Sequence, residues 1–413
     1  DLQDAMRGRL TPETKEVQLG DAEIIQIFNI SKAGKICGCR VNNGTVKVDM
    51  TGATGAVKVI DFTGSGTPDY GKVEVTGGKF VAKVDENNDL VIVPAVAKLG
   101  DTYYASLADA IDAYNAAAAG TAAEPIAYEI TVEAGVYEVS PMTIKQAVGK
   151  TLTITGSPAA QPKLLKAKLG AAPSVPGTTL KLVADNGSIF NISGASSYST
   201  GATLIKNLIL DISIASSDTV SVVSSMSGNA DRYASYVTVE SCKLIGLCDD
   251  NHIAISGPGG TNPEAFALLN SETVNMGRVV QGYFSNVNTN AAYAMKISGC
   301  EFGGDTMVVY NGQTNAGSVD VITDNTVESL VNDYAFRSFG GSMELKDNNV
   351  TTNFKGEVPT GKGVVVMRNN EGVIEAKDNN HTVGDGIQQA IKYAQMRNVP
   401  FAFSSNGDGF LFH

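Results

Sequence analysis

The chain has 413 residues, of which 43% are hydrophobic, 18% are charged and 44 are glycine. This apolar fraction can form a large core and excludes a globally disordered chain, and the formal net charge of −12 argues against a general phosphate-binding surface. Acidic polysaccharides are also disfavoured at long range. No apolar run reaches the ~18 residues of a membrane-spanning helix, so no transmembrane segment is expected. Low charge with many turn residues between short apolar runs favours an all-β chain of two or three domains.

Residues 1–97 are expected to form a small N-terminal β-module. Short alternating runs occupy 46–50, 57–60 and 80–84, and turn signals such as Gly77-Gly78 separate them. A helix is predicted over 106–119, because Ser106 can cap it and an apolar stripe follows. The stripe consists of Leu107, Ala110, Ile111 and Tyr114. Strands are expected at 129–132, 136–139 and 151–155.

A short motif recurs in the second half of the chain. Its form is apolar, variable, small or Asp, Asn or Cys, variable, apolar, and copies begin at Val239, Ile297, Ile322 and Leu345. The last three copies are 25 and 23 residues apart, and the first gap of 58 leaves room for one degenerate copy. A weaker relative lies at 205–208. Periods in this range indicate stacked repeats, and one strand on each side of a polar turn predicts a parallel β-helix.

The polar position of the motif is expected to form an inward stack of Cys242, Cys300, Asn325 and Asn348. An alternative is that Cys242 and Cys300 are metal ligands or a disulfide. The remaining cysteines are Cys37, Cys39 and Cys248. An odd count and a lone CxC leave the redox compartment and the disulfide status open.

Three segments carry a resemblance to a known family: 104–111, 128–137 and 151–156. They resemble the N-terminal start of pectin-lyase-like right-handed β-helix proteins, in which a capping helix leads into the first coils. The sequence is similar in character to secreted or surface β-helix proteins of gut Bacteroidetes over about 98–380. The resemblance implies a right-handed, single-stranded parallel β-helix over 98–371. It also implies a secreted or cell-surface protein, although no signal peptide is present in this chain.

An acidic pair in the β-helix region is a candidate for catalysis. β-Helix enzymes use clustered aspartates for hydrolysis, or Ca²⁺ with a basic residue for elimination. The adjacent pair Asp249-Asp250, followed by His252, would supply an acid and a base. The other motifs of β-helix galacturonases are absent from the sequence. Without tryptophan, and with dispersed Tyr and Phe, no aromatic sugar platform stands out either.

Residues 372–413 resemble the nuclease domain of the restriction (R) subunit of type I restriction-modification enzymes, which has the PD-(D/E)xK fold. By position, Glu375 would be a Mg²⁺ ligand and Lys377 the catalytic lysine. Gln389 and Tyr393 would form the family's Gln-x-x-x-Tyr motif on the next helix. The resemblance implies a Mg²⁺-dependent DNA endonuclease in the cytoplasm.

Departures from that family predict an inactive fragment. The family's preceding aspartate is missing from Gly361–Met367, and no Walker-type motif is present. Residues 374–380 also superimpose on 343–349 and can serve as one more coil. The helix predicted from Asp385 would then cap the open end, or the segment would form a short α/β unit.

We therefore expect an all-β, secreted or cell-surface β-helix protein that functions in adhesion or glycan binding and needs no cofactor. The first alternative is the Mg²⁺-dependent endonuclease fragment, with nucleic acid as its partner. The second is a polysaccharide lyase or glycoside hydrolase, with Ca²⁺ required only by the lyase. Ligand and oligomeric state stay open.

Overall fold

The structure is a computed structural model of the whole chain. It describes residues 24–27, 45–62, 67–156, 177–193, 201–216, 218–226, 236–247, 251–257, 265–282, 292–303, 307–311, 319–330, 335–338, 342–352, 365–367, 372–376, 382–397, 401–405 and 410–412. The chain divides into two compact units, Asp1–Ala110 and Ile111–His413. Neither unit contains, in its described part, a helix long and apolar enough to cross a membrane.

The first unit contains two small sheets. Strands β1 (Ile24–Ile27), β2 (Thr45–Asp49) and β4 (Lys72–Thr76) are parallel. Strands β3 (Val57–Ile60), β6 (Leu90–Pro94) and β5 (Phe80–Val84) are antiparallel. Strands β7 (Ala97–Leu99) and β8 (Thr102–Tyr104) form a hairpin.

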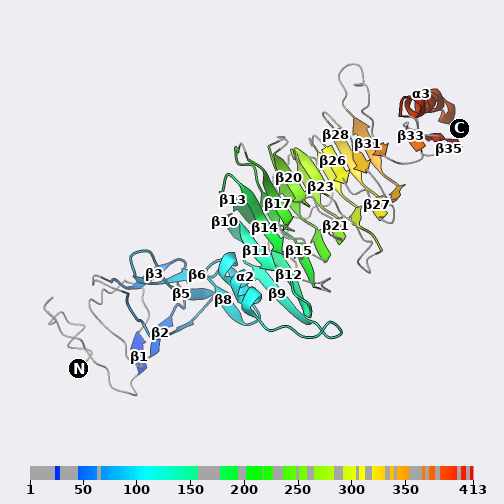
Figure 1. Cartoon of the computed structure of the whole chain (residues 1–413). Coiled ribbons are helices and arrows are strands. Elements are labelled where there is room, and N and C mark those ends of the chain that lie inside the picture. The colour runs from blue at the N-terminus through cyan, green and yellow to red at the C-terminus, as the bar shows by residue number, and fades with distance from the viewer. Residues whose placement is uncertain are drawn as a thin grey trace. The chain divides into compact units, whose positions relative to one another are not determined.

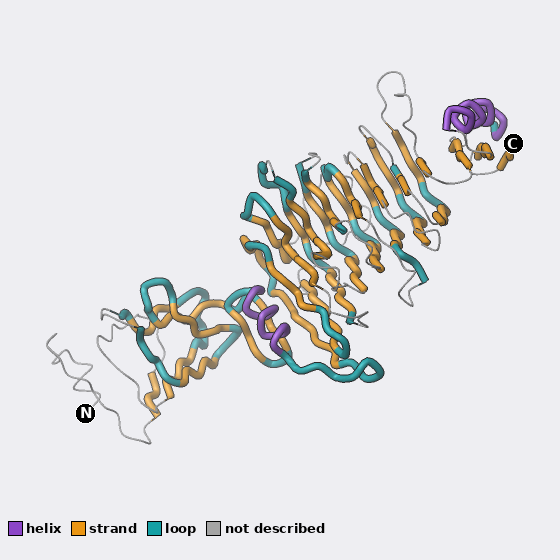
Figure 2. Tube along the Cα trace, in the orientation of Figure 1, coloured by secondary structure: helices purple, strands orange, loops and turns teal. Residues whose placement is uncertain are grey.

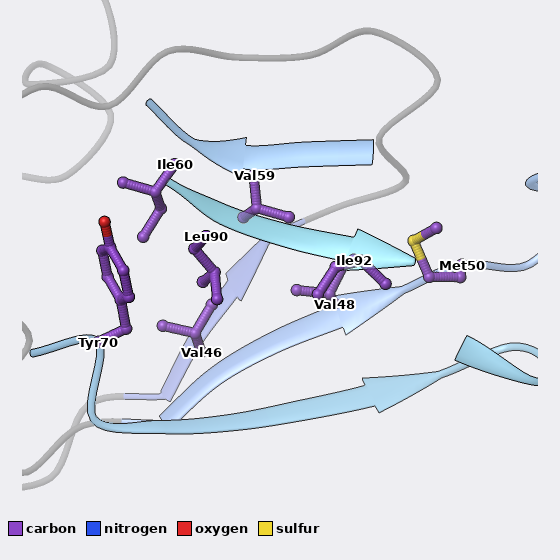
Figure 3. Packing of buried hydrophobic residues seen from close by; sticks show 8 residues of the cluster. All are labelled: Val46, Val48, Met50, Val59, Ile60, Tyr70, Leu90 and Ile92. Carbon is purple, nitrogen blue, oxygen red and sulfur yellow. The ribbon is translucent and has the colours of Figure 1, made fainter. Parts of the chain in front are cut away.

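Figure 3 shows the core of this unit, which consists of Val46, Val48, Met50, Val59, Ile60, Tyr70, Leu90 and Ile92. The alternating runs therefore predicted β2, β3 and β5 to within one residue. In β2 the alternation follows burial, because Val46 and Val48 are buried while the residues between them are less buried.

The second unit is a parallel β-helix (Figures 1 and 2). Its successive coils each contribute one strand to sheet I, then one to sheet II, then one to sheet III. The strands of sheet I are β9 (Ile126–Val132), β12 (Lys150–Gly156), β15 (Ala202–Lys206), β18 (Tyr236–Glu240), β21 (Ala265–Leu269), β24 (Met295–Ser298), β27 (Val319–Thr323) and β30 (Ser342–Lys346). Those of sheet II are β10 (Gly135–Val139), β13 (Thr178–Leu182), β16 (Ile209–Asp211), β19 (Lys243–Ile245), β22 (Glu272–Val274), β25 (Glu301–Gly303), β28 (Thr326–Leu330) and β31 (Asn349–Thr352). Those of sheet III are β11 (Met142–Lys145), β14 (Gly187–Ser193), β17 (Val220–Met226), β20 (His252–Ser256), β23 (Arg278–Gly282), β26 (Met307–Asn311), β29 (Phe336–Ser338) and β32 (Val365–Met367).

Neighbouring coils stack in register, so side chains at equivalent positions lie above one another. One inward column of sheet I contains Ile154, Ile205, Val239, Leu268 and Ile297, all of them buried. Each coil thus buries its apolar residues against the coils before and after it. The all-β fold with parallel stacked coils, predicted from the repeat, is confirmed.

The turn from sheet I to sheet II has the same backbone in successive coils. Its first residue has a positive φ, between 48° and 68°, at Asn207, Ser241, Asn270, Gly299, Asp324 and Asp347. Asn, Asp and Gly tolerate this left-handed conformation best, because short polar side chains or a missing Cβ reduce the steric cost. The motif therefore recurs along the chain for two reasons: the turn needs a residue that tolerates a positive φ, and the interior needs side chains that pack between coils.

The second turn residue points inward and forms the predicted polar column. Its members are Cys242, Ser271, Cys300, Asn325 and Asn348, so Ser271 belongs to the degenerate copy expected in the 58-residue gap, and the apolar Leu208 occupies the same position in the coil before Cys242. The backbone N–H of Cys242 donates to Ser271 Oγ at 3.1 Å, and that of Cys300 donates to Asn325 Oδ1 at 3.0 Å. The column satisfies backbone groups that would otherwise be buried without a partner.

A helix, α2 (Leu107–Ala116), precedes the first coil. Ser106 Oγ accepts a hydrogen bond from the Asp109 N–H at 3.1 Å and donates one to Asp109 Oδ2 at 2.7 Å, as the predicted cap requires. At the other end, the buried Lys150 Nζ of β12 donates to the carbonyl oxygens of Tyr114 at 2.6 Å and Ala117 at 3.1 Å. A lysine from the first coils thus caps the C-terminus of the helix.

The C-terminal residues form a short α/β unit. Strands β33 (Gly372–Ala376) and β34 (Phe401–Ser405) are parallel, and β35 (Phe410–Phe412) is antiparallel to β34. Between them lie the 3₁₀ turn η2 (Val383–Gly386) and α3 (Ile387–Arg397). Ala390 and Ala394 of α3 pack on Ala402 of β34. Because β33 pairs with β34 and belongs to none of the three long sheets, this segment is an α/β unit and not a further coil.

Candidate functional site

The acidic pair proposed for hydrolysis, Asp249 and Asp250, lies outside the described residues. The nearby His252 is described and buried at the start of β20. Its Nε2 lies 2.7 Å from the carbonyl oxygen of Ile214, while Nδ1 has no hydrogen-bond partner among the described residues. His252 is therefore part of the β-helix wall and does not face solvent.

The two described cysteines of the polar column are structural. Cys242 and Cys300 are buried free thiols, and burial raises the pKa of each to about 12. Ser271 occupies the coil between them, and two strand spacings of about 4.8 Å put their Cα atoms beyond disulfide reach. A disulfide between them is excluded, and within the described ranges no three His, Cys, Asp or Glu side chains form a group able to hold a metal.

The residues proposed for the nuclease come from the C-terminal α/β unit. Glu375 lies in β33, with its backbone in register with Ser404 of β34. Lys377 lies outside the described residues. Gln389 and Tyr393 are one turn apart on α3, and Gln389 Nε2 donates to Tyr393 Oη at 2.8 Å. The structure thus brings together the glutamine and tyrosine of the proposed motif, and it places Glu375 on the strand that precedes their helix.

A Mg²⁺ site needs further oxygen ligands beside Glu375. The segment where the family has its aspartate contributes β32, which is the last described strand of sheet III and carries no acid. Ser404 is fully buried, and its Oγ has no hydrogen-bond partner among the described residues. The described residues therefore supply one carboxylate position, that of Glu375, and do not make up a complete Mg²⁺ site.

The outward face of sheet I differs in charge from that of sheet II. Over five strands, β15 to β27, the positions that alternate with the inward column are Ala202, Leu204, Lys206, Tyr236, Thr238, Glu240, Ala265, Ala267, Leu269, Ala294, Lys296, Ser298, Val319, Val321 and Thr323. Among them, Ala265, Ala267 and Ala294 are buried and the others are half-buried. Only Lys206, Glu240 and Lys296 of this set are charged. We call these residues the sheet I face.

The outward positions of sheet II carry many more charges. They include Glu138, Lys181, Asp211, Lys243, Glu272, Glu301 and Glu328. Lys243 Nζ and Glu272 Oε1 of neighbouring coils are 3.0 Å apart. Because ionic groups are strongly hydrated, sheet II has the character of a solvated surface, whereas the sheet I face is largely uncharged.

The chain shows limited similarity to known proteins. Curated translation initiation factor IF-2 proteins match over 47 residues, with 57% identity for Parvibaculum lavamentivorans, 55% for Rhodopseudomonas palustris and 53% for a Bradyrhizobium species. The match covers 11% of this chain and 5% of each of these relatives. No family model matches the chain, and no solved structure matches it significantly. The fold therefore defines the class, a parallel β-helix protein.

The cluster around Lys150 was not predicted from the sequence. Its Nζ lies 4.3 Å from the ring centroid of Tyr114 and 5.8 Å from that of Tyr128. Burial lowers the pKa of Lys150 and raises that of Tyr114 to about 12. A single lysine at the start of an otherwise uncharged strand, Lys150-Thr-Leu-Thr-Ile, is the signal in the sequence that could have indicated this buried cation.

Proposed function

We propose that this protein is a secreted or cell-surface β-helix that binds glycans or other cell-surface components and acts in adhesion. The observation that supports the proposal is the register of the coils from β9 to β32. A stack in register repeats each outward position at a constant interval, and such a surface suits a ligand that is itself a repeating polymer. The β-helix class and the low charge of the sheet I face agree with this proposal.

A glycan array probed with the labelled whole chain tests the proposal. We expect binding to a limited set of related glycans, lost when the chain is heat-unfolded. Absence of binding to every glycan, together with absence of binding to intact bacterial or epithelial cells, would refute the proposal.

A second candidate function is a fragment of a Mg²⁺-dependent DNA endonuclease. Two observations favour it: the segment forms an α/β unit in place of another coil, and Gln389 and Tyr393 are hydrogen-bonded. We expect the chain to be inactive as it stands, since β32 supplies no acid. Cleavage of plasmid DNA that requires Mg²⁺ and disappears in Glu375→Ala and Lys377→Ala would establish the nuclease.

Polysaccharide hydrolysis or elimination remains a third proposal, carried by Asp249 and Asp250 alone. Release of reducing ends, or of unsaturated products when Ca²⁺ is supplied, from acidic polysaccharides would support it. The IF-2 similarity covers too small a share of either chain to carry a function.

A further inference from the structure

We propose that the C-terminal α/β unit closes the open end of the β-helix, with β33 pairing in parallel with the free edge of β30. In the structure, β30 is the last strand of sheet I, and β33 is an edge strand of the sheet β33-β34-β35. Each of these two strands therefore has one edge that pairs with no described strand, and an unpaired edge is a template for another strand. Pairing of the two edges would leave the contact between β33 and β34 intact.

The interior of the β-helix is less covered at β30 than in the coil before it. Ile322 and Val327 of that earlier coil are buried, with exposed fractions of 0% and 1%. Their register partners one coil later, Leu345 and Val350, are only half-buried, and so is Met343. Apolar side chains at the end of a stack need a terminal cap, because no further coil covers them.

The sequence of β33 repeats that of β30. Residues 374–380 read Ile-Glu-Ala-Lys-Asp-Asn-Asn and residues 343–349 read Met-Glu-Leu-Lys-Asp-Asn-Asn, so five of the seven positions are identical. In every coil the next strand of sheet I follows the strand of sheet III. The connection from β32 to β33 has four residues, the same length as that from β11 to β12. β33 therefore stands in the chain where the next strand of sheet I is due.

The turn after β33 carries the residues that would extend the polar column. The N–H of Asn325 donates to Oδ1 of Asn348 in the next coil at 3.2 Å. With β33 on β30, the equivalent acceptor for the Asn348 N–H is the side chain of Asn379. Asp378 then takes the turn position at which Asp347 has a φ of 54°. Asp378 and Asn379 lie outside the described residues and are matched by sequence alone.

The handedness of the crossover places α3 over the open core. A crossover between neighbouring parallel strands is right-handed in about 98% of cases. This rule applies to the coils, which connect sheet I strands through sheets II and III, and to the β33-α3-β34 unit. With β30, β33 and β34 parallel and side by side, both kinds of crossover lie on the same side of sheet I. α3 therefore takes the place of sheets II and III at the end of the stack, where it covers Met343, Leu345 and Val350.

Charged side chains oppose this docking weakly. In the proposed register Glu375 stacks on Glu344 and Lys377 stacks on Lys346, and like charges directly opposite each other in a sheet repel. Glu344 and Lys346 are exposed, so salt screens both repulsions. Docking should therefore be tighter at about 0.5 M NaCl than at about 0.05 M.

Two matched cysteine pairs test the pairing in the whole chain, in which the cysteines other than Cys242 and Cys300 are replaced by serine. Glu344→Cys with Glu375→Cys places the thiols on neighbouring strands of the proposed sheet, about 4.8 Å apart and within disulfide range. Glu344→Cys with Ser404→Cys places them two strands apart, at about 10 Å, because Glu375 and Ser404 are in register. Circular dichroism verifies that each variant folds.

We expect an intramolecular disulfide in at least about half of the molecules with the first pair and in less than about a tenth with the second. Hydrogen exchange of the chain without introduced cysteines supplies an independent readout. Alternate amides of a strand point to opposite edges, so an unpaired edge leaves every second amide of Ser342–Lys346 unprotected. With β33 docked, all of these amides should be protected, and more strongly at the higher salt concentration.

Other results would overturn the proposal. If neither pair crosslinks and every second β30 amide exchanges freely, the end of the β-helix is open in solution. Protection of all β30 amides without the Glu344–Glu375 crosslink would make another segment the occupant, and a disulfide between two chains would make it a second copy. Equal crosslinking of both pairs, or protection that falls with salt, would contradict the register.

Discussion

The side-chain amide of Asn325 donates a hydrogen bond to Oδ1 of Asn348 in the next coil, with 2.8 Å between Nδ2 and Oδ1. The same Asn325 amide donates to the carbonyl oxygen of Ile297 at 3.0 Å, and its Oδ1 accepts from the N–H of Cys300 at 3.0 Å. One buried side chain therefore links backbone or side-chain groups of three successive coils.

Replacing Asn325 with Leu should destabilise the β-helix strongly. The variant keeps similar volume but leaves the buried Cys300 N–H and Ile297 carbonyl without partners, which costs about 2–4 kcal/mol in total. Urea unfolding followed by circular dichroism measures this loss. The control Thr323→Ala, at a half-buried outward position, should change the free energy of unfolding by less than about 1 kcal/mol. Equal effects of the two substitutions would contradict the role of the polar column.

The turn residue Asp324, with φ of 59°, should accept glycine and reject β-branched residues. Gly299 already occupies the same turn position in the preceding coil, with φ of 68°. We expect Asp324→Gly to change the free energy of unfolding by less than about 1 kcal/mol, and Asp324→Val to lower it by about 1–3 kcal/mol. Thermal unfolding midpoints of both variants decide between these values. A valine variant as stable as the glycine variant would show that the turn changes its backbone conformation at little cost.

Stability should fall above pH 9 because Cys242 and Cys300 are buried as thiols. Their pKa rises from 9.0 to about 12 in the folded chain, so between these values the unfolded state releases protons that the folded state keeps. Their contribution is thus complete below pH 9 and declines with rising pH, by about 1.4 kcal/mol per pH unit per thiol. Urea unfolding from pH 8 to pH 11 measures the slope. The double variant Cys242→Ser/Cys300→Ser should show a shallower decline, since serine is native at Ser271 of the same column and does not ionise. An unchanged slope would contradict this assignment.

Truncating Lys150 should loosen the helix that precedes the first coil. Lys150→Ala removes the donors to the Tyr114 and Ala117 carbonyls and the cation beside the Tyr114 ring, a loss of about 2–4 kcal/mol. Lys150→Met should cost less, because it keeps the buried stem and no longer places a charge in the core. Hydrogen exchange of the α2 amides provides the readout. If protection of α2 is the same in the alanine variant, the lysine does not cap the helix.

Much of the β-helix could be predicted because its determinants are local and repeated. The motif around Cys242, Cys300, Asn325 and Asn348 combines a left-handed turn residue with an inward polar residue, and both requirements are visible in a single coil. The degenerate copy expected between Val239 and Ile297 could not be located at Ser271 from the sequence, because a hydroxyl replaces the amide or thiol of the other copies while the backbone remains the same. The contact between Lys150 and Tyr114 could not be predicted for a different reason, because the two residues are 36 positions apart in the chain.

The sequence by itself determined that this protein is built from stacked parallel coils. Short apolar strands, polar turns that tolerate positive φ, and a period near 25 residues leave few other folds. It could not decide the fate of the last segment, because Ile374–Asn380 and Met343–Asn349 have nearly the same local pattern. The tertiary structure decided it. Residues 343–346 pair with β27, whereas β33 pairs with β34, where Ala390, Ala394 and Ala402 are small enough for α3 to approach the sheet. Strand pairing across distant residues, and the close packing that small side chains permit, are properties that no local pattern encodes.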